Sequence, residues 1–243
     1  MRLNGSLQDT ASFIQLLEET CEANDYTFDH ISVFGVVLKL DPGSRLKRLD
    51  LVSALRDRNI GPQDLNICLV HEKAEIVTRS DGTTFPKSEG YGLVGGGVDV
   101  GDFFEEKKVP GSSSSGFDMR SLLAKVSKEK NVTSLFTAIE NALKRESYEE
   151  AGLCVYPLWG MAQIDVKGDG IVVSIVCGVE SEDEGVMDEE EIREKKFVKL
   201  THLPHFAQSV PPMYRTHKDR CARLFFNCFG DKFRNLACAI RVR

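Results

Sequence analysis

The sequence has no long hydrophobic run and no excess of positive charge. No segment approaches the ~20 apolar residues of a membrane-spanning helix, and no apolar run follows Arg2, so neither a membrane span nor a signal peptide is expected. The net charge is −6 and the pI is near 5.5, which argues against a general binder of nucleic acid or anionic membranes. These features predict a cytoplasmic protein.

The sequence also lacks paired cysteines. None of its seven cysteines forms a C-x-x-C pair, and the number is odd. Such a pattern gives little support for a structural zinc site and is typical of buried or idle thiols in a reducing cytoplasm. The seven are Cys21, Cys68, Cys154, Cys177, Cys221, Cys228 and Cys238.

The length of 243 residues fits one large domain or two small ones, and the 42% hydrophobic content is ample for a buried core. No internal repeat and no second-domain boundary is evident. Residues 1–28 read as a helical extension packed on one domain that covers residues 29–243. Apolar runs predict strands over 30–40, 65–71, 74–79, 153–166, 171–179 and 195–200. Apolar spacing predicts helices over 118–130 and 212–226, and a short helix or covering loop over 45–59.

An acidic helix follows the break at Asn131. Glu146, Glu149 and Glu150 stand at i, i+3 and i+4, so their carboxylates share one helix face. The i,i+4 pair of like charges is mildly destabilising by itself, which makes sense if a cation binds there. Hard cations such as Mg²⁺ prefer carboxylate and carbonyl oxygens. The alternative is a solvated face on which Lys144 and Arg145 pair with their neighbours.

The same helix has a buried side and a clear end. Leu135, Ile139 and Leu143 form its apolar stripe, which Ser147 continues weakly, and Gly152 is the expected stop. Upstream, residues 92–101 read as a glycine loop. Glycine permits close backbone approach and positive φ, so carbonyls there can point at a metal; an ordinary glycine-rich turn is the alternative.

Together, the glycine stretch and the acidic helix resemble the Nudix hydrolase box. The family pattern is Gly, five residues, Glu, seven residues, then Arg-Glu-apolar-x-Glu-Glu-x-Gly-apolar. Gly96 and Asp102 fit the first half, with Asp in place of Glu, and residues 145–153 fit the second half, with Ser147 at an apolar position. Residues 103–144 separate the halves, which is 42 residues instead of seven. Because loop-closure entropy grows logarithmically, the longer connection costs only roughly 1.5 kcal/mol more.

The resemblance implies a fold and an activity. The fold would be a Nudix-like α/β/α sandwich with a mixed β-sheet over residues 29–243, interrupted by an insertion at about 103–134. The activity would be Mg²⁺-dependent hydrolysis, with Mn²⁺ as an alternative metal, of the pyrophosphate bond in a nucleoside diphosphate linked to another moiety. The partner would be a small-molecule nucleotide, with nucleic acid expected only as a 5′-end substrate, and a homodimer stays open.

The resemblance also assigns residues. Glu146, Glu149, Glu150 and the carbonyl of Gly95 would bind the metal. Glu149 and Glu150 would be catalytic, together with Arg145, which would orient a box carboxylate through its planar fork.

Further residues are nominated on the substrate side. Asp102 would assist through a water. Arg79 would meet a substrate phosphate, or else be an exposed charge at a strand end. Glu190 or Glu191 would reach the metals from the acidic stretch 180–194, or else belong to a solvated loop.

Two other classes of function compete with the enzyme. One is a catalytically weak Nudix-fold module that binds a nucleotide or a protein, which the interrupted box and Asp102 favour. The other is a scaffold whose insertion is the working part. The insertion itself reads as a lid, a dimer contact or a decoration.

Overall fold

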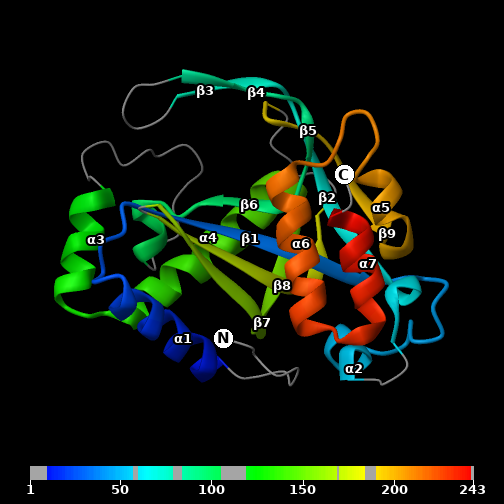
Figure 1. Cartoon of the computed structure of the whole chain (residues 1–243), viewed down its shortest axis with the longest axis horizontal. Coiled ribbons are helices and arrows are strands. Elements are labelled where there is room, and N and C mark those ends of the chain that lie inside the picture. The colour runs from blue at the N-terminus through cyan, green and yellow to red at the C-terminus, as the bar shows by residue number, and fades with distance from the viewer. Residues whose placement is uncertain are drawn as a thin grey trace.

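A computed structural model describes residues 10–56, 60–78, 84–104, 119–168, 170–183 and 190–241. The described chain forms a seven-stranded sheet and a separate two-stranded hairpin (Figure 1). The sheet contains β1 (His30–Leu40), β2 (Leu65–Glu72), β5 (Gly90–Gly92), β6 (Val94–Gly97), β7 (Leu153–Lys167), β8 (Gly170–Glu182) and β9 (Ile192–Lys199), and the hairpin contains β3 (Glu75–Thr78) and β4 (Thr84–Lys87). The helices are α1 (Thr10–Ala23), α2 (Leu51–Arg56), α3 (Met119–Lys128), α4 (Val132–Ala151), α5 (Leu203–Phe206), α6 (Arg215–Cys228) and α7 (Asp231–Arg241).

The sheet is mixed. Its strands run in the order β5–β2–β1–β8–β7, with β9 also paired to β2 and β6 to β1. β1 and β8 are parallel, whereas the other pairings in the sheet are antiparallel. The predicted α/β fold with a mixed sheet is therefore confirmed.

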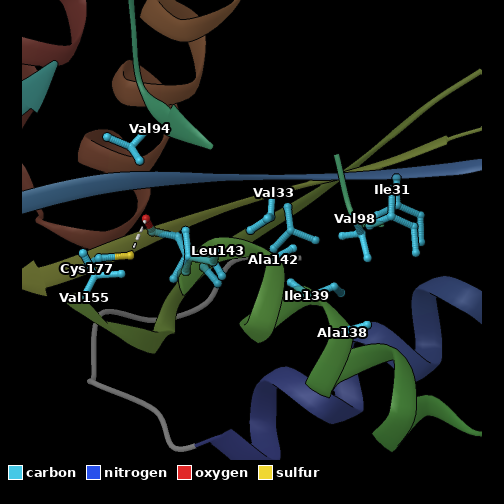
Figure 2. Close-up of a cluster of buried hydrophobic side chains, with 14 of the residues drawn as sticks. Ile31, Val33, Val94, Val98, Ala138, Ile139, Ala142, Leu143, Val155 and Cys177 are labelled. Atoms are coloured by element: carbon cyan, nitrogen blue, oxygen red, sulfur yellow. Dashed lines mark hydrogen bonds between the residues drawn. The ribbon is translucent and has the colours of Figure 1, made fainter. Parts of the chain in front are cut away.

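Each face of the sheet is covered by helices. Alternate residues of β1 point to opposite faces, so Val33 and Val37 join one core cluster while Val36 and Leu38 join the other. The first cluster is covered by α1 and α4; Figure 2 shows Ile139, Ala142 and Leu143 of α4 beside Val33. The second cluster is covered by α6 and α7. The result is a three-layer α/β/α arrangement.

The N-terminal helix is part of this packing. The ring of Phe13 on α1 lies 4.6 Å from the ring of Trp159 on β7, and Phe136 on α4 lies 4.6 Å from the same indole. Leu17 and Cys21 on the same face of α1 are also buried. Trp159 is therefore a core residue that joins α1, α4 and the sheet.

Several sequence predictions need correction. The glycine stretch 92–101, expected as a loop, contains β6 and a 3₁₀-helix (Val100–Phe103). The reason lies in β1 and β2, which pair directly only over residues 38–40 and 65–67. Beyond that point they diverge, and the glycine-rich backbone pairs with both, β5 on β2 and β6 on β1. Backbone pairing needs no side chain, so composition gave no sign of it.

The acidic stretch 180–194 was likewise expected as a loop, but residues 180–182 end β8 and residues 192–194 begin β9. β4 and α7 were not predicted. All seven cysteines are free thiols, and only Cys154 and Cys238 are exposed. In the described part of the chain, no helix combines the length and the apolar character that crossing a membrane requires.

Candidate functional site

The acidic helix α4 begins and ends where its sequence predicts. The side chain of Asn131 caps its first turn by accepting a hydrogen bond from the Ser134 N–H at 3.1 Å. At the other end, Gly152 adopts a left-handed conformation with φ of 60° and donates its N–H to carbonyls of the last turn. The cap fixes the last turn, which carries Glu149 and Glu150.

The buried stripe of α4 runs through Leu135, Ile139 and Leu143 to Ser147, as predicted. Ser147 is fully buried, and its Oγ has no hydrogen-bond partner among the described residues. A buried hydroxyl without a partner costs stability.

We expect Ser147→Ala to stabilise the protein. The change removes the unpartnered hydroxyl and introduces a better helix former, so the free energy of unfolding should rise by about 1 kcal/mol. Urea unfolding followed by circular dichroism measures the change. A loss of stability would mean that the hydroxyl has a partner.

β6 presents one edge to β1 and the other edge to the helices. The Val98 N–H donates to the Ile31 carbonyl at 2.9 Å. In this register the backbone N–H and C=O groups of residues 94, 96 and 98 point toward β1, and those of residues 93, 95 and 97 point away from it. We call the backbone groups of Leu93, Gly95 and Gly97 the outer edge of β6. Side chains bind this edge: Glu150 Oε2 accepts the Gly95 N–H at 2.8 Å.

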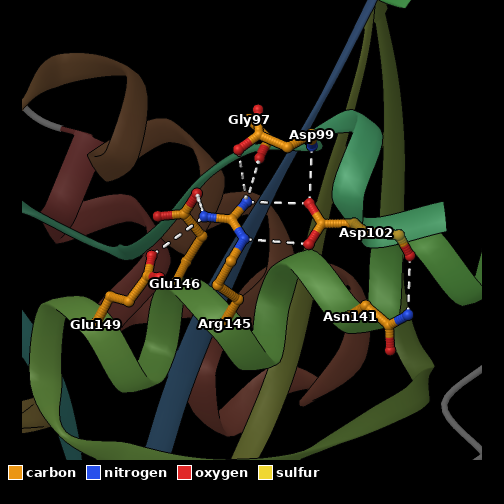
Figure 3. Close-up of polar contacts among 7 residues, drawn as sticks. All are labelled: Gly97, Asp99, Asp102, Asn141, Arg145, Glu146 and Glu149. Atoms are coloured by element: carbon orange, nitrogen blue, oxygen red, sulfur yellow. Dashed lines mark hydrogen bonds and ion pairs between the residues drawn. The ribbon is translucent and has the colours of Figure 1, made fainter. Parts of the chain in front are cut away.

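Arg145 joins the acidic helix α4 to the segment that follows β6 (Figure 3). Its Nε and Nη2 donate to the two carboxylate oxygens of Asp102 at 3.1 and 3.0 Å, across 43 positions of sequence. Nη1 donates to Glu146 at 2.8 Å and to Glu149 at 3.2 Å, and Nη2 also donates to Gly97 O at 3.0 Å. One guanidinium thus contacts two helix carboxylates, the outer edge of β6 and Asp102.

The 3₁₀-helix that carries Asp102 is fastened to α4 by a second contact. Asn141 Nδ2 donates to the backbone carbonyl of Asp102 at 2.8 Å. Asp102 is buried, and its Oδ2 also accepts the Asp99 N–H at 2.7 Å. The geometry therefore makes Asp102 the fixed partner of Arg145.

The surroundings of Glu146 and Glu150 disfavour the charged form of both carboxyl groups. Burial raises the pKa of Glu146 to about 7, although Arg145 acts in the opposite direction. Burial also raises the pKa of Glu150 well above its usual range, with a further increase from the charges of Glu146 and Glu72. Buried carboxylates that repel each other favour a bound cation.

The donor set has the chemistry that Mg²⁺ requires, namely carboxylate oxygens beside a glycine backbone. In the arrangement of the described side chains, no three His, Cys, Asp or Glu residues converge closely enough to hold a metal ion. Arg145 contacts Glu146 and Glu149, and Glu150 is bound to the Gly95 N–H. Space for the carboxylates comes from Gly96, because a Cβ there would lie 2.6 Å from Glu146 Oε1.

The three glycines of β6 give a graded test. Gly95 has φ of 135°, and a Cβ on it would lie 2.2 Å from Val33 O, so Gly95→Ala should cost more than about 2 kcal/mol of stability. Gly96→Ala should fold but displace the Glu146 carboxylate and lower any activity. Gly97→Ala is the matched control, since nothing lies within 4 Å of its Cβ. Thermal unfolding of the three variants would contradict this order if Gly97→Ala were the least stable.

Two charged residues that sequence analysis missed lie beside the site. Glu72 is buried at the end of β2 and forms a close ion pair with Lys87 of β4, which also contacts Glu75 at 3.1 Å. The charge of Glu72 raises the pKa of Glu150. The sequence signal that could have found Glu72 is a glutamate at the end of an apolar strand.

The remaining nominated residues are placed as follows. Glu191 is near Glu72: its charge contributes to raising the pKa of Glu72, and its carbonyl accepts the Lys73 N–H at 2.8 Å. Glu190 is exposed. Arg79 lies outside the described residues.

His217 of α6 also binds the outer edge of β6. Its Nδ1 accepts the Leu93 N–H at 2.8 Å, and burial lowers its pKa from 6.5 to about 3, with Arg220 and Lys87 acting in the same direction. Glu72 faces the same position, since a Cβ on Gly92 would meet both side chains.

The buried imidazole predicts a pH dependence of stability. The unfolded chain binds the proton below about pH 6.5 and the folded chain only below about pH 3, so stability falls as the pH drops through this window. The slope from this group approaches about 1.4 kcal/mol per pH unit. Urea unfolding between pH 7 and 4 should show a shallower decline for His217→Asn, and equal slopes would contradict a neutral His217.

Comparisons with known proteins give distant structural matches only. No family model and no curated protein matches the chain. A NUDIX hydrolase from Nitrosomonas europaea matches with 12% identity and a TM-score of 0.34, over 72% of this chain and 76% of the other. A NUDIX hydrolase from Alicyclobacillus acidocaldarius matches with 11% identity and a TM-score of 0.41, over 84% and 99%. An ADP-ribose pyrophosphatase from Streptococcus suis matches with 13% identity and a TM-score of 0.32, over 87% and 90%. At such values the functional argument rests on the residues of this chain.

Proposed function

We propose that the chain is a Nudix-type pyrophosphohydrolase. It would hydrolyse the pyrophosphate bond of a nucleoside diphosphate linked to another moiety, with Mg²⁺ or Mn²⁺ as the metal. The observation that carries the proposal is the contact of Arg145 with Asp102, Glu146 and Glu149 at once. This contact supports the proposal, because it brings Asp102 to the acidic helix although 42 residues separate Asp102 from Arg145.

Glu146, Glu149, Glu150 and the Gly95 carbonyl would hold the metal. When bound, the ion would neutralise the diphosphate and lower the pKa of a water that attacks phosphorus. Gly95 is suited to the task because it lies on the outer edge of β6, where its N–H already meets Glu150.

The chain's own residues would supply orientation. Arg145 would hold Glu146 and Glu149 in place, and Asp102 would fix Arg145 through the two-pronged contact, which restricts the guanidinium to one plane. Glu191, beside Glu72, and Arg79 stay proposed contacts on the substrate side. Positioning of this kind, together with electrostatic stabilisation, dominates phosphoryl-transfer catalysis.

A substrate panel tests the proposal. Purified protein would be incubated with nucleotide sugars, ADP-ribose, dinucleoside polyphosphates, (d)NTPs and capped RNA, with and without Mg²⁺, and the products separated by anion-exchange chromatography. We expect Mg²⁺-dependent release of a nucleoside monophosphate or a phosphate-containing product from at least one class. No metal-dependent turnover on any class would contradict the proposal.

A second candidate is a Nudix-fold module that binds a nucleotide or a protein and catalyses little. Two observations favour it: Glu146 and Glu149 are hydrogen-bonded to Arg145, and no three His, Cys, Asp or Glu side chains converge among the described residues. Calorimetric titration with the same panel separates the two readings. Micromolar binding without turnover would support the module.

A further inference from the structure

The hydrogen bond between His217 and Leu93 connects parts of the chain that are 124 positions apart. Both residues are buried, at 8% and 1% exposure. The imidazole packs against the ring of Phe34 at 4.9 Å and the ring of Tyr214 at 5.6 Å. With two aromatic neighbours and one short hydrogen bond, the ring has a fixed orientation.

Leu93 stands at the point where the glycine-rich segment changes partners. β5 ends at Gly92 and pairs with β2, and β6 begins at Val94 and pairs with β1. Leu93 itself belongs to neither strand. Its N–H is accepted by the side chain of His217 instead of by the carbonyl of a neighbouring strand. The absence of a side chain at Gly92 makes room, because a Cβ there would lie 3.2 Å from Nδ1 of His217.

The outer edge of β6 is thereby bound at three alternate residues. His217 binds the N–H of Leu93, Glu150 binds the N–H of Gly95, and Arg145 binds the carbonyl of Gly97. The first comes from α6 and the other two come from α4. The three contacts lie on one edge of the same segment. Loss of the contact between His217 and Leu93 would therefore let the backbone rotate at the residues that precede Gly95.

We propose that His217 is a positioning residue for the candidate metal site, acting through Leu93 to set the direction of the Gly95 backbone. The inference rests on the proposed function. It assigns to α6, which carries no residue of the motif, a direct part in shaping the site.

The role needs an acceptor at Nδ1. A buried backbone N–H that loses its acceptor is costly, so the segment would shift to satisfy it. Asn places its Oδ1 close to the position of Nδ1, whereas Gln places its polar atoms near Nε2. His217→Asn should therefore retain the contact, and His217→Gln and His217→Ala should lose it.

The test measures Mn²⁺ affinity and amide hydrogen exchange in the full chain. We expect His217→Ala and His217→Gln to bind Mn²⁺ roughly tenfold more weakly than the parent and to speed exchange at Leu93 by a similar factor. His217→Asn should stay within about twofold of the parent. Cys221→Ala is the matched control, since it also removes buried atoms from α6 one turn away.

The outcomes separate this inference from the function on which it rests. A parent that binds Mn²⁺, with His217→Gln and His217→Asn binding equally, would overturn the role of His217 alone. A parent without Mn²⁺ affinity would overturn the proposed function and this inference with it. The comparison of Asn with Gln stands even if His217→Ala fails to fold, because both variants keep a polar side chain.

Discussion

Glu150→Gln is expected to abolish metal-dependent turnover and to stabilise the metal-free protein at the same time. Glutamine keeps the shape of the side chain and an oxygen for the Gly95 N–H, which Glu150 accepts at 2.8 Å. It removes a carboxyl group whose charged form is disfavoured by burial and by the charges of Glu146 and Glu72. Turnover should fall by roughly a thousandfold, and the free energy of unfolding should rise.

Glu149→Gln provides the matched comparison. Its side chain is 46% exposed, so the loss of its charge should reduce turnover similarly and leave stability unchanged. Steady-state rates on the substrate found in the panel, and thermal unfolding without metal, give both quantities. Activity of either variant within a fewfold of the parent would refute the assignment.

Arg145→Ala should destabilise the protein strongly, although the side chain of Arg145 is partly exposed. It would leave Asp102, at 6% side-chain exposure, buried without its cation. Removing one partner of a buried ion pair typically costs roughly 3–5 kcal/mol, and the partial exposure of Arg145 places the expected loss at about 3 kcal/mol. Turnover should be lost as well, because Glu146 and Glu149 lose their shared donor.

A double variant isolates the pair. Arg145→Ala combined with Asp102→Ala should recover much of the stability, since no buried charge remains, without recovering turnover. Lys144→Ala is the neighbouring control: its contact with Glu140 is half exposed and should be worth less than about 0.5 kcal/mol. Denaturant unfolding of the parent, Arg145→Ala, the double variant and Lys144→Ala measures these stabilities. Equal losses of unfolding free energy for Lys144→Ala and Arg145→Ala would contradict the role of Arg145.

The acidic helix was predictable because its signals are local. Its cap at Asn131, its apolar stripe and its stop at Gly152 lie in one continuous segment. The strand over residues 30–40 was predictable for the same reason, since a run of β-branched residues marks it. Residues 95, 145, 146, 149 and 150 could be nominated because the motif places them at fixed spacings.

The rest of the site depends on contacts between distant segments. Glu72 and Lys87 meet because β4 returns antiparallel to β3 and pairs Lys87 with Glu75, three positions after Glu72, and neither residue stands in a motif. His217 reaches Leu93 only through the packing of α6 on the sheet. The pairing of β6 with β1 was missed because hydrogen bonds of a glycine backbone leave no trace in hydrophobic periodicity.

The two hydrogen bonds between Arg145 and Asp102 have a consequence for changes in the length of this chain. Arg145 and Asn141, both on α4, hold the 3₁₀-helix around Asp102 through side-chain contacts, so the separation of these two elements is not set by the length of the chain that connects them. Changes of length are compatible with this fold only where the connection supplies no core residue, because Leu122 and Leu123 of α3 and the apolar stripe of α4 are buried.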